Sequence, residues 1–275
     1  MSQPYPSTSL YTAAKHCLLC CDVNEKIRLT QFIARQWRDG LLDLAGNDTV
    51  ETLADAGRPE YPELVSPAKL AKRSINTLQG RQALVHAICH IEFNAINLAL
   101  DAVYRFRDMP LDYYSDWLQV AYEEAYHFSL LQERLRQMDC DYGDFNAHNG
   151  LWEMACKTDH DVMVRMALVP RVLEARGLDV TPGMIQRLRS AGDLRTVALL
   201  EIILRDEIGH VAIGTRWFQY LCQQRDMNAD QTFADLLQTY MKGHVKGPFY
   251  EQGRREAGFS EVELTILKQQ AGYHE

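Results

Sequence analysis

The 275-residue sequence lacks any run of about 18 apolar residues, the length that a helix needs to cross a membrane. Met1 to Pro6 also lack the basic and apolar stretches of a signal peptide, so we expect no export. The seven cysteines are an odd number and are scattered, which favours reduced thiols over a disulfide framework. Cys17 and Cys20 form a CxxC pair, but no second such pair accompanies it. We therefore predict a cytoplasmic protein that does not act at a membrane.

Basic residues are fewer than acidic residues. Lys and Arg number 29 against 37 Asp and Glu, which gives a formal net charge of −8. This balance argues against a general nucleic-acid surface, because phosphate contacts are built from clustered Lys and Arg. One local basic cluster exists, and we interpret it as solvated: Lys69, Lys72, Arg73 and Arg81. No nicotinamide or flavin fingerprint is present, so redox chemistry here would need an external electron donor.

Helical periodicity dominates the rest of the chain. Apolar residues recur at i, i+3, i+4 and i+7 without sustained strand alternation, and glycine and proline fall mainly between these stretches. We predict an all-α protein with four long helices, at about 81–107, 112–138, 153–177 and 192–225, and a short helix at about 182–190 before the fourth.

Shorter helical patterns flank these four helices. Two precede them, at about 7–21 and 24–39, and are followed by a polar, proline-bearing segment, 46–80, that we interpret as a wrapping loop. One follows at 229–241, and Ser260 to Glu263 form a capping box that begins a last helix. We predict three parts: an N-terminal helical arm and loop (1–80), a four-helix bundle (81–225) and a C-terminal helical extension (226–275).

The connections predict the topology of the bundle. The first and second helices are joined tightly, as antiparallel neighbours are. About 14 residues join the second helix to the third, enough to stretch roughly 45 Å and cross the length of the bundle. A long crossover between helices two and three is the ferritin-like form of a four-helix bundle.

Two of the four helices carry the motif Glu-x-x-His, at Glu124–His127 and at Glu207–His210. Each is preceded, 32 or 33 positions earlier, by a glutamate on another long helix. One copy of the motif is weak evidence, since a surface Glu–His pair is common. Two copies in equivalent helix pairs form an internal repeat, which predicts a metal site with six ligands: Glu92, Glu124, His127, Glu174, Glu207 and His210.

The ligand types indicate which metal binds. Residues i and i+3 lie on one helix face, so each Glu-x-x-His pair can bind one ion or two adjacent ions. Four carboxylates carry a charge of −4, which two divalent ions neutralise. Oxygen and imidazole ligands without thiolate suit iron or manganese better than structural zinc. We predict two iron ions, or a manganese/iron pair.

The neighbours of these glutamates support an inward position. Glu92 and Glu124 each lie in an apolar stripe, where an unpaired carboxylate is rarely tolerated. Glu123 and Asp206 precede the histidines by four residues and are candidates to orient the imidazoles, with a solvated face as the alternative. Pro170 lies one turn before Glu174 and should disturb the third helix there.

Four segments resemble a known family. They are Pro62–Val65, His90–Ile96, Val169–Asp179 and Arg205–Ala212, with further likeness at Gly247–Phe249 and Ala257–Ser260. These segments are similar to a ferritin-like bacterial family catalogued as domain of unknown function 455. The resemblance covers most of the chain and implies a ferritin-like fold and the six-ligand site, and all six residues are present. A more distant likeness is to a ferritin-like tRNA hydroxylase that oxidises an isopentenyl-type modified adenosine.

These observations lead to one functional expectation and two alternatives. We expect a non-haem dinuclear oxidase or monooxygenase that uses O2 to oxidise or hydroxylate an unidentified substrate, a small molecule or a tRNA-linked group. The first alternative is a hydroxylase of a modified tRNA nucleoside, against which the acidic charge counts. The second is a non-catalytic iron-binding protein. A homodimer is compatible with each of them.

Overall fold

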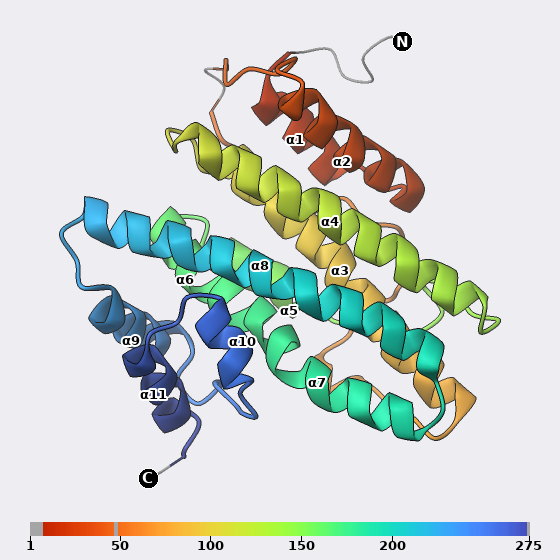
Figure 1. Cartoon of the computed structure of the whole chain (residues 1–275). Helices are drawn as coiled ribbons and strands as arrows, with labels where there is room; N and C mark the ends of the chain where they lie inside the picture. Colours follow the sequence, from red (N-terminus) through yellow and green to blue (C-terminus); the bar gives the residue numbers. More distant parts are fainter. Residues whose placement is uncertain (1–7, 47–48, 274–275) are drawn as a thin grey trace. The chain divides into compact units, whose positions relative to one another are not determined.

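A computed structural model describes residues 8–46 and 49–273 (Figure 1). This part of the chain contains eleven α-helices and no β-strand, which confirms the predicted all-α class. Residues Met1 to Pro6 and the predicted start of the first helix at 7 lie outside the described residues. The chain divides into two compact units, Met1–Cys156 and Lys157–Glu275. The four helices predicted for the bundle are drawn from both units.

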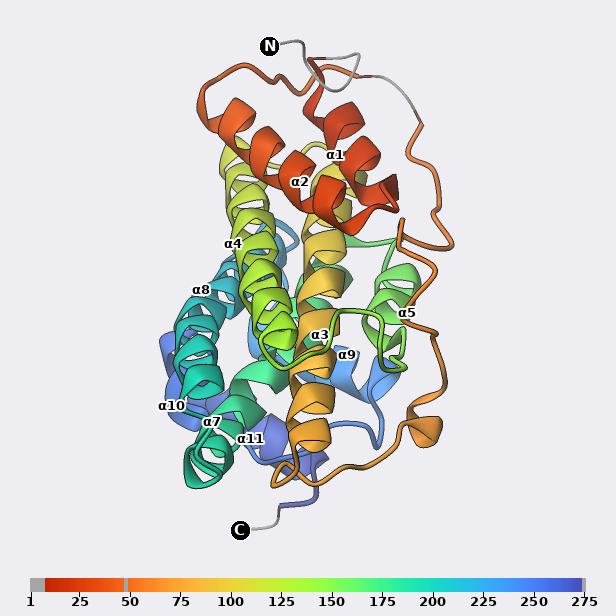
Figure 2. The same ribbon diagram turned by 90° about the vertical axis from the view of Figure 1, so that its right-hand side faces the viewer.

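The first unit is built around two long antiparallel helices (Figure 2). Helix α3 (Leu78–Arg105) and helix α4 (Leu111–Arg136) are joined by a five-residue turn and lie side by side, close to the predicted bounds. The hydroxyl of Thr77 caps α3 by accepting from the Gly80 N–H at 3.0 Å. The remaining helices of this unit are α1 (Leu10–Leu19), α2 (Val23–Arg38), the 3₁₀ turn η1 (Pro67–Lys69) and α5 (Gly150–Lys157).

Helix α3 lies in the core of the first unit. It is the one described helix that is long and apolar enough to cross a membrane, with a mean hydropathy of 1.4 over its most apolar 18 residues. However, 78% of that stretch is buried inside the protein, which is typical of a core helix. The buried residues include carboxylate, amide and imidazole side chains, among them Glu92, Asn97 and His86. Helix α3 therefore contributes many of the interior polar groups of the first unit, together with Lys26 of α2 and with Glu124 and His127 of α4.

Helices α1 and α2 pack against α3 and α4, and an irregular segment, described at 41–46 and 49–77, follows them (Figure 2). Lys26 of α2 is fully buried and donates to Oδ1 of Asn97 at 2.6 Å and to the carbonyl of Leu18 at 2.8 Å. Burial lowers the pKa of this lysine to about 8. The irregular segment, hereafter the strap, contacts α1 where the Gly57 N–H donates to Leu18 at 2.9 Å. It overlaps the segment 46–80 that the sequence predicts as a wrapping loop, although α3 already begins at Leu78.

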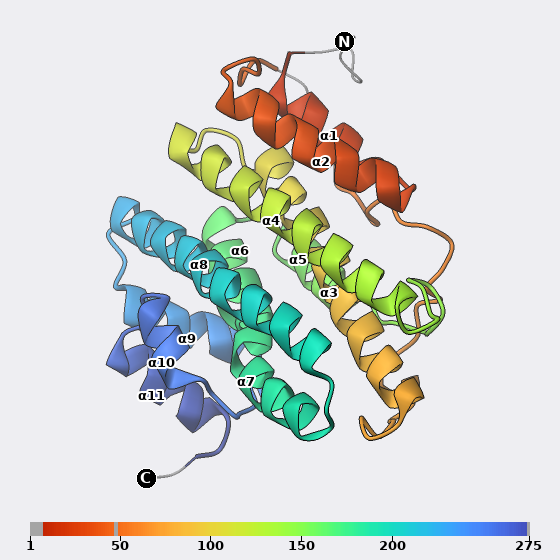
Figure 3. The ribbon, with the colours of Figure 1, turned by 45° about the vertical axis from the view of Figure 1, so that its right-hand side comes forward.

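The second unit contains α6 (Val162–Leu168), the π-helical segment η2 (Val169–Glu174), α7 (Ala175–Ser190) and α8 (Leu194–Gln224). Helices α7 and α8 are antiparallel and lie side by side (Figure 3). Three shorter helices follow them, α9 (Ala229–Tyr240), α10 (Glu251–Glu256) and α11 (Glu261–Gln270). Ser260 and Glu263 form the predicted capping box at the start of α11.

The third predicted helix, 153–177, differs from the structure at both ends. A break at 158–161 separates α5 from α6, because Asp161 caps a new helix by accepting from the Met163 N–H at 2.7 Å. The expected stop at 177–183 is absent, since α7 continues through Pro182 to Ser190. The hydroxyl of Thr181, the residue before this proline, donates to the carbonyl of Gly177 at 2.7 Å. The predicted disturbance at Pro170 is confirmed, because the π-helical segment η2 contains this residue.

Two buried arginines join η2 to the C-terminal helices. Arg171 of η2 is fully buried and forms an ion pair with Glu263 at 2.7 Å, and its guanidinium lies about 4.4 Å from the rings of both Phe233 and Phe259. Arg254 of α10 forms a bidentate pair with Asp179 at 2.7 and 2.9 Å. It also donates to the Arg171 carbonyl at 3.2 Å, so a single side chain contacts both η2 and α7.

Replacing Arg254 tests how much its contacts with Asp179 and Arg171, hereafter the brace, contribute to the stability of the second unit. Arg254→Met leaves the buried carboxylate of Asp179 without its partner, so we expect a loss of about 3–5 kcal/mol in the free energy of unfolding. The neighbouring Arg255 forms exposed ion pairs with Glu251 and Glu261, so Arg255→Met is the matched control and should move the unfolding midpoint little. Urea unfolding of both variants measures the difference. Equal midpoints for the two would show that the brace does not stabilise the unit.

Candidate metal centre

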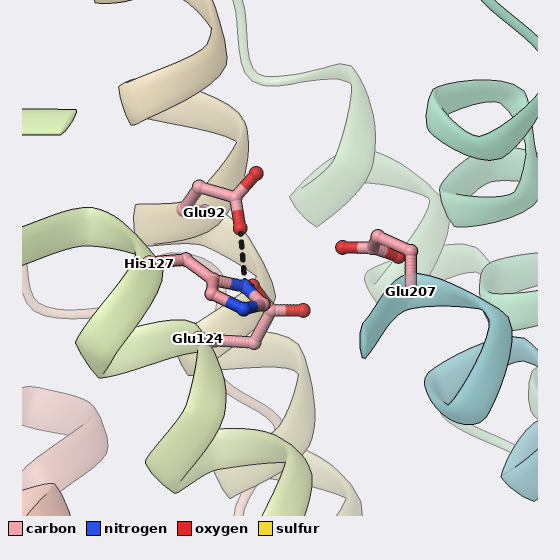
Figure 4. Close-up of side chains that lie close together, drawn as sticks. All are labelled: Glu92, Glu124, His127 and Glu207. Atoms are coloured by element: carbon pink, nitrogen blue, oxygen red, sulfur yellow. Dashed lines mark ion pairs between the residues drawn. The ribbon is translucent and has the colours of Figure 1, made fainter. Parts of the chain in front are cut away.

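The first unit brings three of the predicted ligands together (Figure 4). Glu92 of α3 and Glu124 and His127 of α4 are 2%, 1% and 0% exposed. Nδ1 of His127 lies 3.3 Å from Oε2 of Glu92 and 3.5 Å from Oε2 of Glu124. One potential ligand atom from each of the three lies within 4.8 Å of the others, and such a group can hold a metal ion. We call these three residues the first half-site.

The pKa shifts in the first half-site reflect its excess of buried negative charge. Burial, and then the neighbouring Glu124, raise the pKa of Glu92 well above its usual value. Burial alone would lower the pKa of His127, but the carboxylates of Glu124 and Glu92 outweigh it and raise that pKa to about 11. Without a cation, the cluster therefore takes up protons to neutralise its buried negative charge. A divalent ion supplies the same neutralisation, which is why the cluster fits a metal.

The second unit holds the other three predicted ligands. Glu174 ends the π-helical segment η2 and is 8% exposed, while His210 of α8 is 1% exposed. Glu207, which Figure 4 shows projecting from α8, lies one turn before His210. Nδ1 of His210 is 3.8 Å from Oε1 of Glu207. We call these three residues the second half-site.

The two Glu-x-x-His motifs have the same internal geometry. In each, the Nδ1 nitrogen of the histidine faces the carboxylate of the glutamate three residues earlier, at 3.5 Å on α4 and 3.8 Å on α8. In each unit a further buried glutamate comes from a different element, α3 in the first and η2 in the second. The internal repeat that the sequence shows is therefore also present in the structure of the two Glu-x-x-His motifs, whose Glu–His distances are similar.

The two residues expected to orient the imidazoles have other contacts. Glu123 is half-buried and accepts a hydrogen bond from Gln119 at 2.6 Å. The carboxylate of Asp206 is 19% exposed and accepts from the neighbouring Arg205 at 2.9 Å. Their role as orienting partners of His127 and His210 stays a prediction.

The other histidines near the candidate ligands are occupied elsewhere. Nε2 of His86 accepts from the Gly143 N–H at 2.9 Å, and Nδ1 of His90 lies 2.8 Å from the hydroxyl of Tyr142. Burial lowers the pKa of both imidazoles to about 4, so both are neutral at physiological pH. They join α3 to the segment after α4.

Close packing in the second unit fixes the backbone that carries Glu174. A Cβ added at Gly214 of α8 would lie 2.5 Å from Cβ and Cγ of Pro170, so only glycine allows η2 to approach α8 this closely. Gly214, Arg171 and Arg254 were not predicted from the sequence to shape this region. Arg171 stands in an otherwise apolar stretch, and this position could have indicated its burial. Nothing in the sequence distinguishes Gly214 from other glycines.

Helices with buried carboxylates and imidazoles in a repeated arrangement define an all-helical protein with a candidate metal centre. Residues 19–265 match the family model described as "Protein of unknown function (DUF455)", and the chain belongs to this family. An uncharacterized protein of Haemophilus influenzae (strain Rd) is 50% identical over 219 residues, which covers 77% of this chain and 76% of that protein. No solved structure gives a significant match.

The contact at Gly214 gives a matched pair of variants on one helix. Gly214→Ala forces a methyl group against Pro170, so we expect a cost of about 1–3 kcal/mol and weaker metal binding through Glu174. Gly209→Ala meets nothing within 4 Å and should stabilise α8 by up to about 1 kcal/mol. Thermal unfolding with and without added metal measures both effects. A Gly214→Ala protein as stable as Gly209→Ala would contradict the close-packing argument.

Glu124 gives the direct test of the first half-site. Glu124→Gln keeps the size of the side chain and removes an anionic ligand, so we expect metal affinity to fall at least tenfold. Glu133 lies exposed on the same helix, and Glu133→Gln is the control that should bind as the wild type does. Titration with Fe(II) or Mn(II), followed by elemental analysis, measures the binding. Unchanged binding in Glu124→Gln would remove Glu124 from the ligand set.

Proposed function

We propose that the protein is a ferritin-like dinuclear metalloprotein that uses O2 to oxidise or hydroxylate a substrate. The observation that carries this proposal is the pair of Glu-x-x-His motifs on α4 and α8, in each of which the histidine Nδ1 faces the glutamate carboxylate, together with the buried glutamates Glu92 on α3 and Glu174 on η2. Each half-site would supply three protein ligands. Ferritin-like di-iron and di-manganese proteins use the combined set, with a glutamate from each of two helices and Glu-x-x-His from each of the other two.

The charges of the combined set favour two divalent ions. Glu92, Glu124, Glu174 and Glu207 would carry a charge of −4, which two Fe(II) ions, or one Mn(II) and one Fe(II), would neutralise. Oxygen and nitrogen ligands without thiolate suit both metals. The bound pair would supply one-electron and O2 chemistry that protein side chains alone do not provide.

The side chains of the chain would hold and enclose the ions. Each histidine would bind through Nδ1, the nitrogen that already faces a carboxylate in both half-sites. The apolar residues beside the ligands, such as Cys89, Ile96 and Phe128, are fully buried and exclude water from the first half-site.

Loading with iron tests this function. Protein loaded anaerobically with Fe(II) should consume O2 in a fast phase proportional to the bound iron, because paired ferrous ions deliver electrons together. The Glu124→Gln and Glu207→Gln variants should each lose most of this phase, while the exposed control Glu133→Gln keeps it. An oxygen electrode measures the O2 consumed, and a metal count on the same sample gives the ratio of O2 consumed to iron bound. Iron bound at about two ions per chain without O2 consumption would contradict the oxidase proposal and favour iron binding alone.

A further inference from the structure

The first unit contains a pocket of about 410 Å³ on the outer side of α3. This volume lies in the range of small-molecule sites. Its floor is a face of α3 that presents Ala83, Ala87 and Ile91, and Ile91 is 41% exposed although it is a large apolar residue. Phe145 and Leu151, from the chain that follows α4, complete the apolar part of the lining. The pocket therefore has an apolar interior that is accessible from solvent.

Hydrogen bonds on both sides hold the walls of the pocket in place. The strap pairs with the segment after α4, because the Val65 N–H donates to Ala147 at 2.8 Å and the Ala147 N–H donates to Glu63 at 3.0 Å. On α3, the imidazole of His90 contacts the hydroxyl of Tyr142 at 2.8 Å and the carbonyl of His148 at 3.2 Å. The pocket is consequently a built feature of the unit, with walls from three separate segments.

Two cations of the strap line the same pocket. Arg73 places its guanidinium 5.0 Å from the centre of the Phe145 ring, and Lys69 ends the turn η1. Neither forms an ion pair with a carboxylate in the described part of the chain. The carboxylate in the lining, Asp144, already accepts from the Asp141 N–H at 2.8 Å. The pocket therefore offers two cations for an anion from outside the chain.

Neutral polar groups complete the recognition surface. Nδ1 of His148 accepts from the Gly150 N–H at 3.2 Å, which leaves Nε2 to carry the ring proton as a donor. Asn94 is 6% exposed and uses its amide nitrogen on His90, so its amide oxygen remains as an acceptor. Both residues line the pocket. A bound molecule can thus meet cations, one imidazole donor and one amide acceptor around an apolar floor.

We propose that this pocket binds a small organic anion, a carboxylate or phosphate monoester with an apolar body, with the anion at Lys69 and Arg73 and the apolar body on α3. The site is distinct from the first half-site, because His90 and Asn94 lie about 200° around α3 from Glu92. The proposal does not depend on the metal function. The ligand and the metal would bind on opposite faces of the same helix.

Calorimetric titration of the full chain tests the proposal. The probes are octanoate and octyl phosphate, with 1-octanol as the neutral analogue and inorganic phosphate as the anion without an apolar body. We expect saturable binding of both anionic probes at one site per chain, at least tenfold tighter than 1-octanol and than inorganic phosphate. Octanoate and octyl phosphate together distinguish a preference for carboxylate from one for phosphate.

Three variants locate the binding. Lys69→Gln combined with Arg73→Gln should weaken both anionic probes at least tenfold, and Ala87→Phe should weaken them similarly by filling the floor. Lys72→Gln removes a neighbouring charge that does not line the pocket and should leave binding unchanged. Metal content is measured in every sample, so a lost metal centre is told apart from a lost pocket. Absent binding, equal binding of 1-octanol or of inorganic phosphate, or full binding by the double variant would each overturn the proposal.

Discussion

The burial of Glu92 and Glu124 beside His127 is the constraint on which the first unit depends. Two carboxylates and an imidazole without access to water need a counter-charge, and the pKa values of Glu92 and His127 are both raised in this cluster. The long antiparallel pair α3 and α4 keeps these groups enclosed by apolar stripes. A cluster that costs stability in this way is expected where function requires it.

The second unit also carries buried candidate ligands, but it holds one of them on a π-helical segment rather than on a long regular helix. Its buried glutamate Glu174 lies at the end of a π-helical segment, and such segments are frequent at functional sites. The close approach of Pro170 to Gly214 sets the position of this segment against α8, and the buried guanidiniums of Arg171 and Arg254 join it to the C-terminal helices. The C-terminal extension is therefore part of what shapes the second half-site.

Most of the helical architecture could be predicted from periodicity and capping. The bounds of α3, α4 and α8 follow from long amphipathic patterns, and the capping box at Ser260 marks α11. The third helix could not be predicted in the same way, because the Asp161 cap that begins a new helix depends on a local hydrogen bond, and α7 continues through Pro182, a residue type that normally ends a helix. Burial of Glu92 and Glu124 was predictable from the apolar residues around them.

The parts of the two sites that depend on tertiary contact were not predictable. The close packing at Gly214 involves two segments more than 40 residues apart, and the buried ion pair between Arg171 and Glu263 involves segments still further apart. Lys69 and Arg73 were interpreted as solvated cations, and they prove to line a pocket because the strap pairs with the segment around Ala147. A charge pattern alone does not show which cations a distant segment will enclose.

We propose that the ligands of the two half-sites bind two metal ions as a coupled pair. Electron paramagnetic resonance of the oxidised, iron-loaded protein tests it most directly, together with an iron count on the same sample. A coupled diferric pair gives no signal, so the account predicts about two iron ions per chain, a silent spectrum, and loss of both ions in Glu124→Gln and in Glu207→Gln. Isolated ferric signals of full intensity, with each variant losing one ion and keeping the other, would contradict the claim.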